Sequence, residues 1–290
     1  MIAEGKLQSA MEYLMTYGWA ILAIAIVMVS LYSLGIFNAG NLTPTAAPGS
    51  CEVVRTVAQT SFAGQCGNLI PKYVGVFLNP KNAYVTLSKG MNLTGSFTVS
   101  MWTEFGLPIT SHYYNLIGGA QSNTSKAALQ VSMVPTSDTS LTAQIWVGIG
   151  VGSSNCAFQT GQFDNKWHNV VVTYNGTYIT LYVDKQYIAN RNCAGPYDTP
   201  LKYIAKGGWN NVFNGTMSNV QIYNASLDTA SIVALYQEGI GGAPIDVKHL
   251  MGWWPLNGNA NDYSGNNNQG TQTNVNWNAN WQSGYAAPKS

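Results

Sequence analysis

The stretch KWHNVVVTYNGTYITLYVD, Lys166 to Asp184, decides the fold. Each half roughly alternates apolar and polar side chains with a period of two, which is the pattern of a strand with one face on a core. Asn175-Gly176-Thr177 lies between the halves, and Asn-Gly is a strong signal for a tight turn. The stretch therefore predicts an antiparallel hairpin with strands at Asn169–Tyr174 and Tyr178–Val183.

The same period recurs along the chain in short segments that Gly, Asn and Pro separate. Further strands are predicted at Tyr84–Leu87, Ser96–Trp102, Ala128–Met133, Thr142–Val147 and Met217–Tyr223. Only Thr229–Glu238 favours a short helix. Many short strands at regular spacing predict a mainly β protein with an antiparallel β-sandwich.

The composition favours a secreted β-protein. Charged residues make up 9% of the 290 residues, against about 25% in ordinary soluble domains. The net charge is +1 and there is no basic block, which argues against a nucleic-acid partner. Aromatic residues make up 12%, which argues against disorder.

Five segments carry a resemblance to laminin G-like, concanavalin A-like sandwich domains. They are Lys166–Tyr174 with Ile179–Asp184, the late strand Phe213–Tyr223, the short helix Leu227–Tyr236 and the early strand Gly95–Trp102. The resemblance covers about residues 72–237. It implies a jelly roll of this family in a domain that we place at residues 51–290, with adhesion or glycan binding as its role.

The C-terminal part, residues 251–290, resembles the segment that normally opens such a domain, although here it comes last. The similar residues are Gly252–Gly258 and Asn261–Gly270. Three explanations are open: circular permutation of the domain, a strand that completes a neighbouring copy, or a truncated second copy. Permutation ranks first.

The N-terminal segment is apolar and long. Residues 8–37 would form a helix of about 45 Å, and Tyr13 to Phe37 contain no charge. This length and apolarity are compatible with a membrane span. A short leader at residues 1–7 precedes the helix, and a Pro-containing linker at residues 38–50 follows it.

QSAMEYL, Gln8 to Leu14, followed by an apolar helix, resembles the class III signal of archaeal type IV pilin-like proteins. The resemblance implies that a prepilin peptidase cuts before Gln8, and that Glu12 meets a terminal amine. A membrane assembly platform then bundles copies of the helix into a filament core. The residue before the cut is Leu7, where that family usually has glycine or a basic residue. The alternative is a plain single-pass anchor that carries Glu12 by chance.

An even number of cysteines in a secreted chain suggests two disulfides. The simplest of three connectivities pairs Cys51 with Cys66 and Cys156 with Cys193. Buried free thiols are the alternative.

Calcium is the one plausible metal cofactor. Asp262, Ser264 and Asn266 offer the oxygen ligands that calcium accepts. The alternative is an Asx-turn in which Asp262 caps backbone amides.

Glycan contacts would need exposed aromatic rings, although most tryptophans of a sandwich belong to its core. Trp209 and Trp277 are the candidates for stacking on a sugar. Six N-x-S/T sequons could carry glycans: Asn41, Asn92, Asn123, Asn175, Asn214 and Asn224. Asn175, at the hairpin tip, is the best candidate.

No enzyme is expected. A glycoside hydrolase needs two carboxylates about 5–10 Å apart, and Glu52, Glu104 and Glu238 follow no such motif. His168 is interpreted as packing at the hairpin. The sequence thus predicts a structural subunit of an extracellular pilus-like filament, membrane-inserted before assembly, whose sandwich binds surface glycans. A surface lectin on a single-pass anchor is the alternative.

Overall fold

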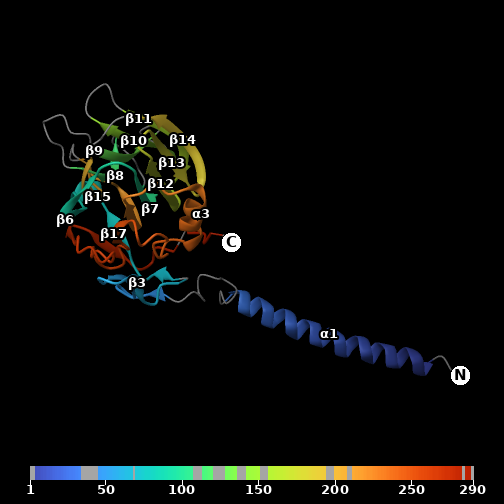
Figure 1. Ribbon diagram of the computed structural model, residues 1–290. Helices are drawn as coiled ribbons and strands as arrows, with labels where there is room; N and C mark the ends of the chain where they lie inside the picture. The colour runs from blue at the N-terminus through green and yellow to red at the C-terminus, as the bar shows by residue number, and fades with distance from the viewer. Residues whose placement is uncertain are drawn as a thin grey trace. The chain divides into compact units, whose positions relative to one another are not determined.

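The computed structural model describes residues 4–33, 45–67, 69–106, 113–119, 128–135, 142–150, 156–193, 199–207, 211–282 and 285–288. The chain separates into two compact units, Met1–Pro44 and Thr45–Ser290. Within the described residues, the first unit is a helix and the second contains the strands (Figure 1).

Helix α1 spans Glu4–Ser33, whereas the sequence predicted a helix over residues 8–37. Leu34–Phe37 lie outside the described residues, as do the side chains of Gln8 and Glu12. Ile26–Val29 are all exposed, and successive helical residues point about 100° apart, so the apolar surface surrounds the helix. In the part of the chain described here, no helix is long and apolar enough to cross a membrane, so the predicted span is not found there.

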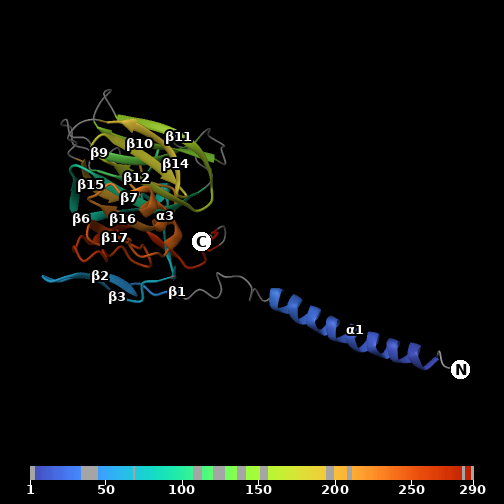
Figure 2. The same cartoon turned by 45° about the vertical axis from the view of Figure 1, so that its right-hand side comes forward.

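The second unit is a sandwich of two antiparallel sheets that face each other (Figures 1 and 2). The order of the seven-stranded sheet is β11 (Cys156–Asp164), β10 (Thr142–Gly150), β9 (Ala128–Pro135), β8 (Tyr114–Gly118), β15 (Thr199–Ile204), β6 (Tyr84–Leu93) and β18 (Gly270–Thr273). The order of the eight-stranded sheet is β14 (Gln186–Asn192), β13 (Tyr178–Val183), β12 (His168–Tyr174), β7 (Phe97–Phe105), β16 (Gly215–Tyr223), β5 (Val74–Phe77) and β19 (Asn276–Asn278), with β17 (Leu250–Trp254) also on β16. The predicted antiparallel β-sandwich is confirmed.

Smaller elements complete the unit. They are the parallel pair β1 (Thr45–Ala46) and β4 (Ile70–Pro71), the hairpin β2 (Cys51–Arg55) and β3 (Thr60–Gly64), the 3-10 turn η1 (Asn79–Lys81) and helix α3 (Thr229–Glu238). Helix α3 has the predicted bounds. Its N-cap is Asp228, whose side chain accepts a hydrogen bond from the backbone N–H of Ser231.

The eight-stranded sheet is buried on both faces at its centre. In β12, Val170 and Val172 enter the core between the sheets, while Val171 packs on the outside with Ile232 and Leu235 of α3. A third apolar cluster, which contains Trp102, Trp167 and Trp281, covers another part of this face. Among the described residues, the free surface of this sheet therefore lies mainly at its edges, near β13 and β14 and at β19, whose side chains are partly exposed.

The predicted hairpin is present between β12 and β13. Asn175 Oδ1 accepts hydrogen bonds from the backbone N–H groups of Thr177 (2.9 Å) and Tyr178 (2.7 Å), which closes the turn. These contacts form an Asx-turn, the conformation in which Asn side chains favour tight turns.

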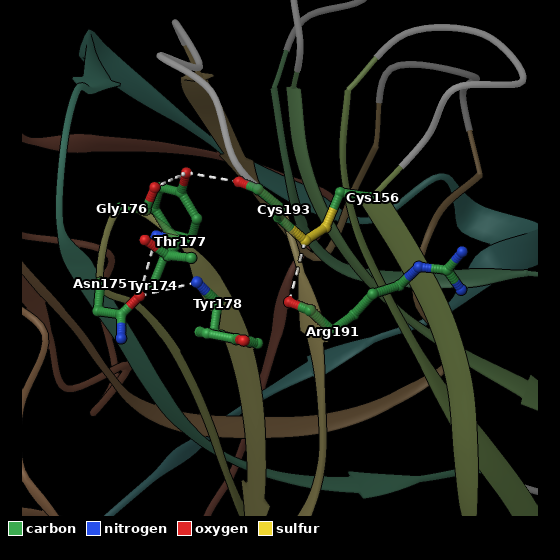
Figure 3. The surroundings of a disulfide bond; sticks show 8 residues. All are labelled: Cys156, Tyr174, Asn175, Gly176, Thr177, Tyr178, Arg191 and Cys193. Carbon is green, nitrogen blue, oxygen red and sulfur yellow. Dashed lines mark hydrogen bonds between the residues drawn. A yellow bond between two sulfur atoms is a disulfide. The ribbon is translucent and has the colours of Figure 1, made fainter.

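Both predicted disulfides are present. Cys51 and Cys66 have Cα atoms 4.9 Å apart, and Cys156 and Cys193 have Cα atoms 5.2 Å apart. The second disulfide joins the start of β11 to the residue after β14 (Figure 3). Because β11 and β14 are edge strands of the two sheets, this bond ties the sheets together at one rim.

The C-terminal segment pairs within its own chain. Strand β17 runs antiparallel to the second half of β16, and Trp254 is fully buried in the core between the sheets. Strands β18 and β19 extend one sheet each. This arrangement is the one that permutation requires, whereas the family's own strand order stays a prediction.

The linker differs from its predicted bounds. Thr45–Ser50 belong to the sandwich unit, because β1 pairs with β4 and the carbonyl of Ala46 accepts hydrogen bonds from Asn257 Nδ2 (2.9 Å) and the backbone N–H of Lys72 (3.1 Å). Residues 38–44 lie outside the described residues.

Candidate functional site

The outer face of the seven-stranded sheet carries a row of polar residues across four strands. The register aligns Gln159 of β11 with Trp146 of β10, Trp146 with Ser132 of β9, and Ser132 with Asn115 of β8. We call Asn115, Ser132 and Gln159, with the neighbouring Gln130 of β9 and Gln144 of β10, the polar row. Directly opposed residues of an antiparallel sheet share a face, and the alternate residues Ile145 and Val147 enter the core. The side chain of Trp146 is outside the described residues.

Hydrogen bonds order this face. Ser132 Oγ donates to Asn115 Oδ1 (2.5 Å), and Gln130 Nε2 donates to Ser132 Oγ (3.0 Å). Nearer the sheet edge, Gln159 Nε2 donates to Gln144 Oε1 (2.6 Å). Asn115 and Ser132 are fully buried, whereas Gln159 is exposed and Gln144 is partly exposed. The row is therefore anchored at one end and open to solvent at the other.

A short segment crosses the anchored end. Asn115 Nδ2 donates to the carbonyl of Asn211 (2.8 Å), and the N–H of Gly207 donates to the same carbonyl (3.2 Å). A Cβ atom at Gly207 would overlap the Asn115 side chain, so this close approach requires glycine. Trp209 lies between Gly207 and Asn211 in the sequence, outside the described residues.

Two tyrosines and a lysine extend the face. Tyr203 pairs with Gly118, which in turn pairs with Gln130. Tyr203 meets Tyr84 edge to face, with ring centroids 5.9 Å apart. Lys206 Nζ lies 4.0 Å from the centroid of the Tyr84 ring and 5.4 Å from that of Tyr203, in cation–π geometry.

These groups suit an uncharged, hydroxyl-rich ligand. Amides and hydroxyls donate and accept hydrogen bonds without the desolvation cost of full charges. Aromatic rings offer flat apolar faces beside them. Sequence reasoning missed this face, although polar residues at a period of two in the predicted strands Ala128–Met133 and Thr142–Val147 were a usable signal.

The predicted stacking residue Trp277 does not lie on this face. It belongs to β19 of the eight-stranded sheet, is half-buried, and packs against the main core beside Gly75. The structure therefore brings neither predicted tryptophan to the polar row within the described residues.

The predicted calcium ligands form a hydrogen-bonded turn. Asp262 Oδ1 accepts from the backbone N–H of Trp253 (3.1 Å) and Ser264 (2.9 Å), and Oδ2 accepts from that of Asn268 (2.8 Å). Asn266 Nδ2 donates to the carbonyls of Leu250 and Met251. Among the described residues, no group of three or more His, Cys, Asp or Glu could hold a metal. Asp262 thus caps backbone amides, as the Asx-turn alternative requires, and calcium stays a prediction.

The sequons differ in exposure. Asn92, Asn175 and Asn224 are exposed, and Asn214 is half-buried. Asn41 and Asn123 lie outside the described residues.

A laminin G-like family model, described as the concanavalin A-like lectin/glucanases superfamily, matches residues 79–233, more than half of the chain. The chain belongs to this superfamily. The match confirms the resemblance that the sequence carried over about residues 72–237, and it ends before the C-terminal segment.

Two solved structures have a similar fold. A heptameric SAP-like pentraxin from Limulus polyphemus is 14% identical with a TM-score of 0.52, over 71% of this chain and 94% of the pentraxin. A putative carbohydrate binding protein from Bacteroides ovatus is 18% identical with a TM-score of 0.55, over 78% of this chain and 65% of that protein. No curated protein sequence matches the chain.

His168 lies between two carboxylates in this lectin-like sandwich. Its Nδ1 is 2.7 Å from Asp184 Oδ2, and its Nε2 is 3.1 Å from Asp164 Oδ1. Lys166 also pairs with Asp164. Burial opposes protonation of the ring, but the hydrogen bonds and charges of Asp184 and then Asp164 outweigh it and raise the pKa of His168. The ring thus joins the end of β11 to the β13–β14 turn.

We predict a pH-dependent contribution of His168 to stability. Because the pKa of His168 is raised by folding, its contribution is complete below the unfolded pKa of about 6.5 and is lost as pH rises through the folded pKa. Urea unfolding between about pH 5.5 and about pH 8.5 should show a larger loss of free energy of unfolding in the wild type than in Asp184→Asn.

Asp184→Asn is a conservative test, because its side-chain oxygen can still accept the bond from the backbone N–H of Asn169 (2.9 Å). The pair His249–Asp246 is present in both proteins and serves as an internal control. Equal pH dependence in the two proteins would contradict the prediction.

Proposed function

We propose that the sandwich binds glycans on the outer face of the seven-stranded sheet. The observation that carries this proposal is the polar row, which offers ordered amides beside aromatic rings. The superfamily to which the chain belongs contains lectins, and the name of the Bacteroides ovatus protein is compatible with this role.

The order of the row favours binding. The buried pair Ser132 and Asn115 holds the partly exposed Gln130 through Ser132 Oγ, so the Gln130 amide needs little rearrangement when a ligand arrives. Gln144 and Gln159, at the open end, are the amides that a sugar can reach. Tyr203 supplies a ring on the same face.

We propose binding without catalysis. The three glutamates of the sandwich lie on separate elements: Glu52 on β2, Glu104 on β7 and Glu238 at the end of α3. Burial raises the pKa of Glu104, against a hydrogen bond from Thr216 that lowers it. Asp262 and its neighbours remain a proposed calcium site.

A double substitution, Gln144→Ala with Tyr203→Ala, should weaken glycan binding about tenfold or more, because it removes a hydrogen bond and a ring contact. Titration calorimetry of the full chain in detergent would measure this, with the best ligand from a panel of neutral and acidic oligosaccharides. The same titration with added calcium, and again with a chelator, tests whether glycan binding needs the metal.

The matched control is Gln186→Ala with Tyr187→Ala, which changes two exposed side chains of the same types on β14 of the other sheet. An equal loss of glycan affinity in both double variants would contradict the proposed binding face. Absence of binding to every oligosaccharide of the panel would contradict the lectin role.

We further propose that α1 assembles copies of the chain into a surface filament. A helix that is apolar on all sides needs cover, and α1 exposes apolar residues all round. The exposed side chains are Met15, Tyr17, Trp19, Ile21, Leu22, Ile24, Ile26, Val27, Met28 and Val29. Bundled copies would provide that cover. The two disulfides and the laminin G-like domain suggest an extracellular or cell-surface protein.

In this proposal, a prepilin peptidase exposes Gln8 as the mature terminus and Glu12 pairs with a terminal amine. Sequencing of the mature protein should therefore start at Gln8. Electron microscopy of surface fractions should show filaments in the wild type and in Glu52→Ala, an exposed acid on β2, and few or none in Glu12→Ala. An intact Met1 terminus, or filaments unchanged by Glu12→Ala, would contradict assembly through this helix.

A further inference from the structure

Two sequons of this chain have the same sequence and opposite surroundings. They are Asn175-Gly176-Thr177 and Asn214-Gly215-Thr216, both Asn-Gly-Thr. Since the triplets are identical, a difference in their modification must come from the structure around them. A sequon that carries a glycan belongs on the surface, because the sugar is bulky and solvated.

The first triplet is open. Asn175, Gly176 and Thr177 are all exposed at the tip of the β12–β13 hairpin. Asn175 uses its side-chain oxygen in the turn, where it accepts from the backbone N–H groups of Thr177 and Tyr178. Its Nδ2, the atom that would carry a sugar, points away from these bonds (Figure 3). A sugar can therefore be attached without any change in the turn.

The second triplet is built into the sheet. Asn214 Oδ1 accepts from the backbone N–H of Asn79, and Asn214 Nδ2 donates to the carbonyl of Gly106, both at 3.4 Å. Thr216 Oγ1 donates to Glu104 Oε2 (3.0 Å). Gly215 is buried and pairs on both sides, with β5 and with β7. A sugar on Asn214 would have to break these contacts.

We propose that Asn175 is an N-glycosylation site and that Asn214 is not. In the reaction, Asn175 Nδ2 forms a bond to the anomeric carbon of an activated sugar phosphate donor. The carbon–oxygen bond of the donor breaks, its phosphate leaves with the electron pair, and the amide releases one proton. The donor and its transferase come from the cell that secretes the chain.

The position suggests what the sugar covers. The carbonyl of Thr177 accepts a bond from the N–H of Cys193 (2.6 Å), so the hairpin tip lies beside the rim disulfide. Tyr178, which is 41% exposed, pairs with Asn192 of the edge strand β14. A glycan on Asn175 would shield this ring and the open edge from pairing with other chains.

Glycopeptide mass spectrometry of the chain, purified from the cells that make it, tests the proposal. The peptide with Asn175 should carry sugar in most copies, and the peptide with Asn214 should carry none. An unmodified Asn175, or sugar on Asn214, would overturn the proposal.

Thr177→Ala provides the control. It destroys the first sequon but leaves Asn175 and its turn in place, and Thr177 is exposed, so the variant should fold. Compared with the wild type, its intact mass should be lower by the mass of one glycan, in addition to the difference between threonine and alanine. A mass that still includes this glycan would show that the sugar lies elsewhere and would overturn the assignment.

Discussion

Strand β16 is the element on which the sandwich depends. It pairs with β7 along one side, and on the other side with β5 over its first half and with β17 over its second half. Strand β17 follows α3 and brings Trp254 into the core between the sheets and Trp253 into the outer cluster. The last part of the chain thus completes both the sheet and the packing on its two faces.

This completion determines which surface is free to bind. Helix α3 and the aromatic cluster around Trp102, Trp167 and Trp281 cover the eight-stranded sheet, so its central strands are buried on both sides. The seven-stranded sheet instead carries polar side chains opposite its core face. The glycan proposal therefore follows from the packing of the whole domain as well as from the polar row.

The sequence predicted the parts that local patterns encode. The hairpin at Asn175 and the main strands were readable from the period of two and the turn residues, and α3 has the bounds that the sequence favoured. The sequence analysis missed β8, β14 and β15. Strand β8 is buried on both faces and lacks a period of two, and β14 is mostly exposed. The polar row depends on register between distant strands, which one strand's sequence does not specify. The predicted linker, residues 38–50, extends too far, because β1 belongs to the sandwich. Its residue Ala46 accepts hydrogen bonds from Lys72 and Asn257, which a local sequence pattern cannot reveal.

The central claim is that the chain closes its own sandwich with β17. Amide hydrogen exchange of the full chain in detergent, at two widely separated protein concentrations, tests it most directly. The account predicts that amides of β17 exchange as slowly as those of β7 at both concentrations, because both pair with β16 in the same molecule. Fast exchange in β17 at low concentration, with protection that returns at high concentration, would show that the strand completes a neighbouring copy and would contradict the account.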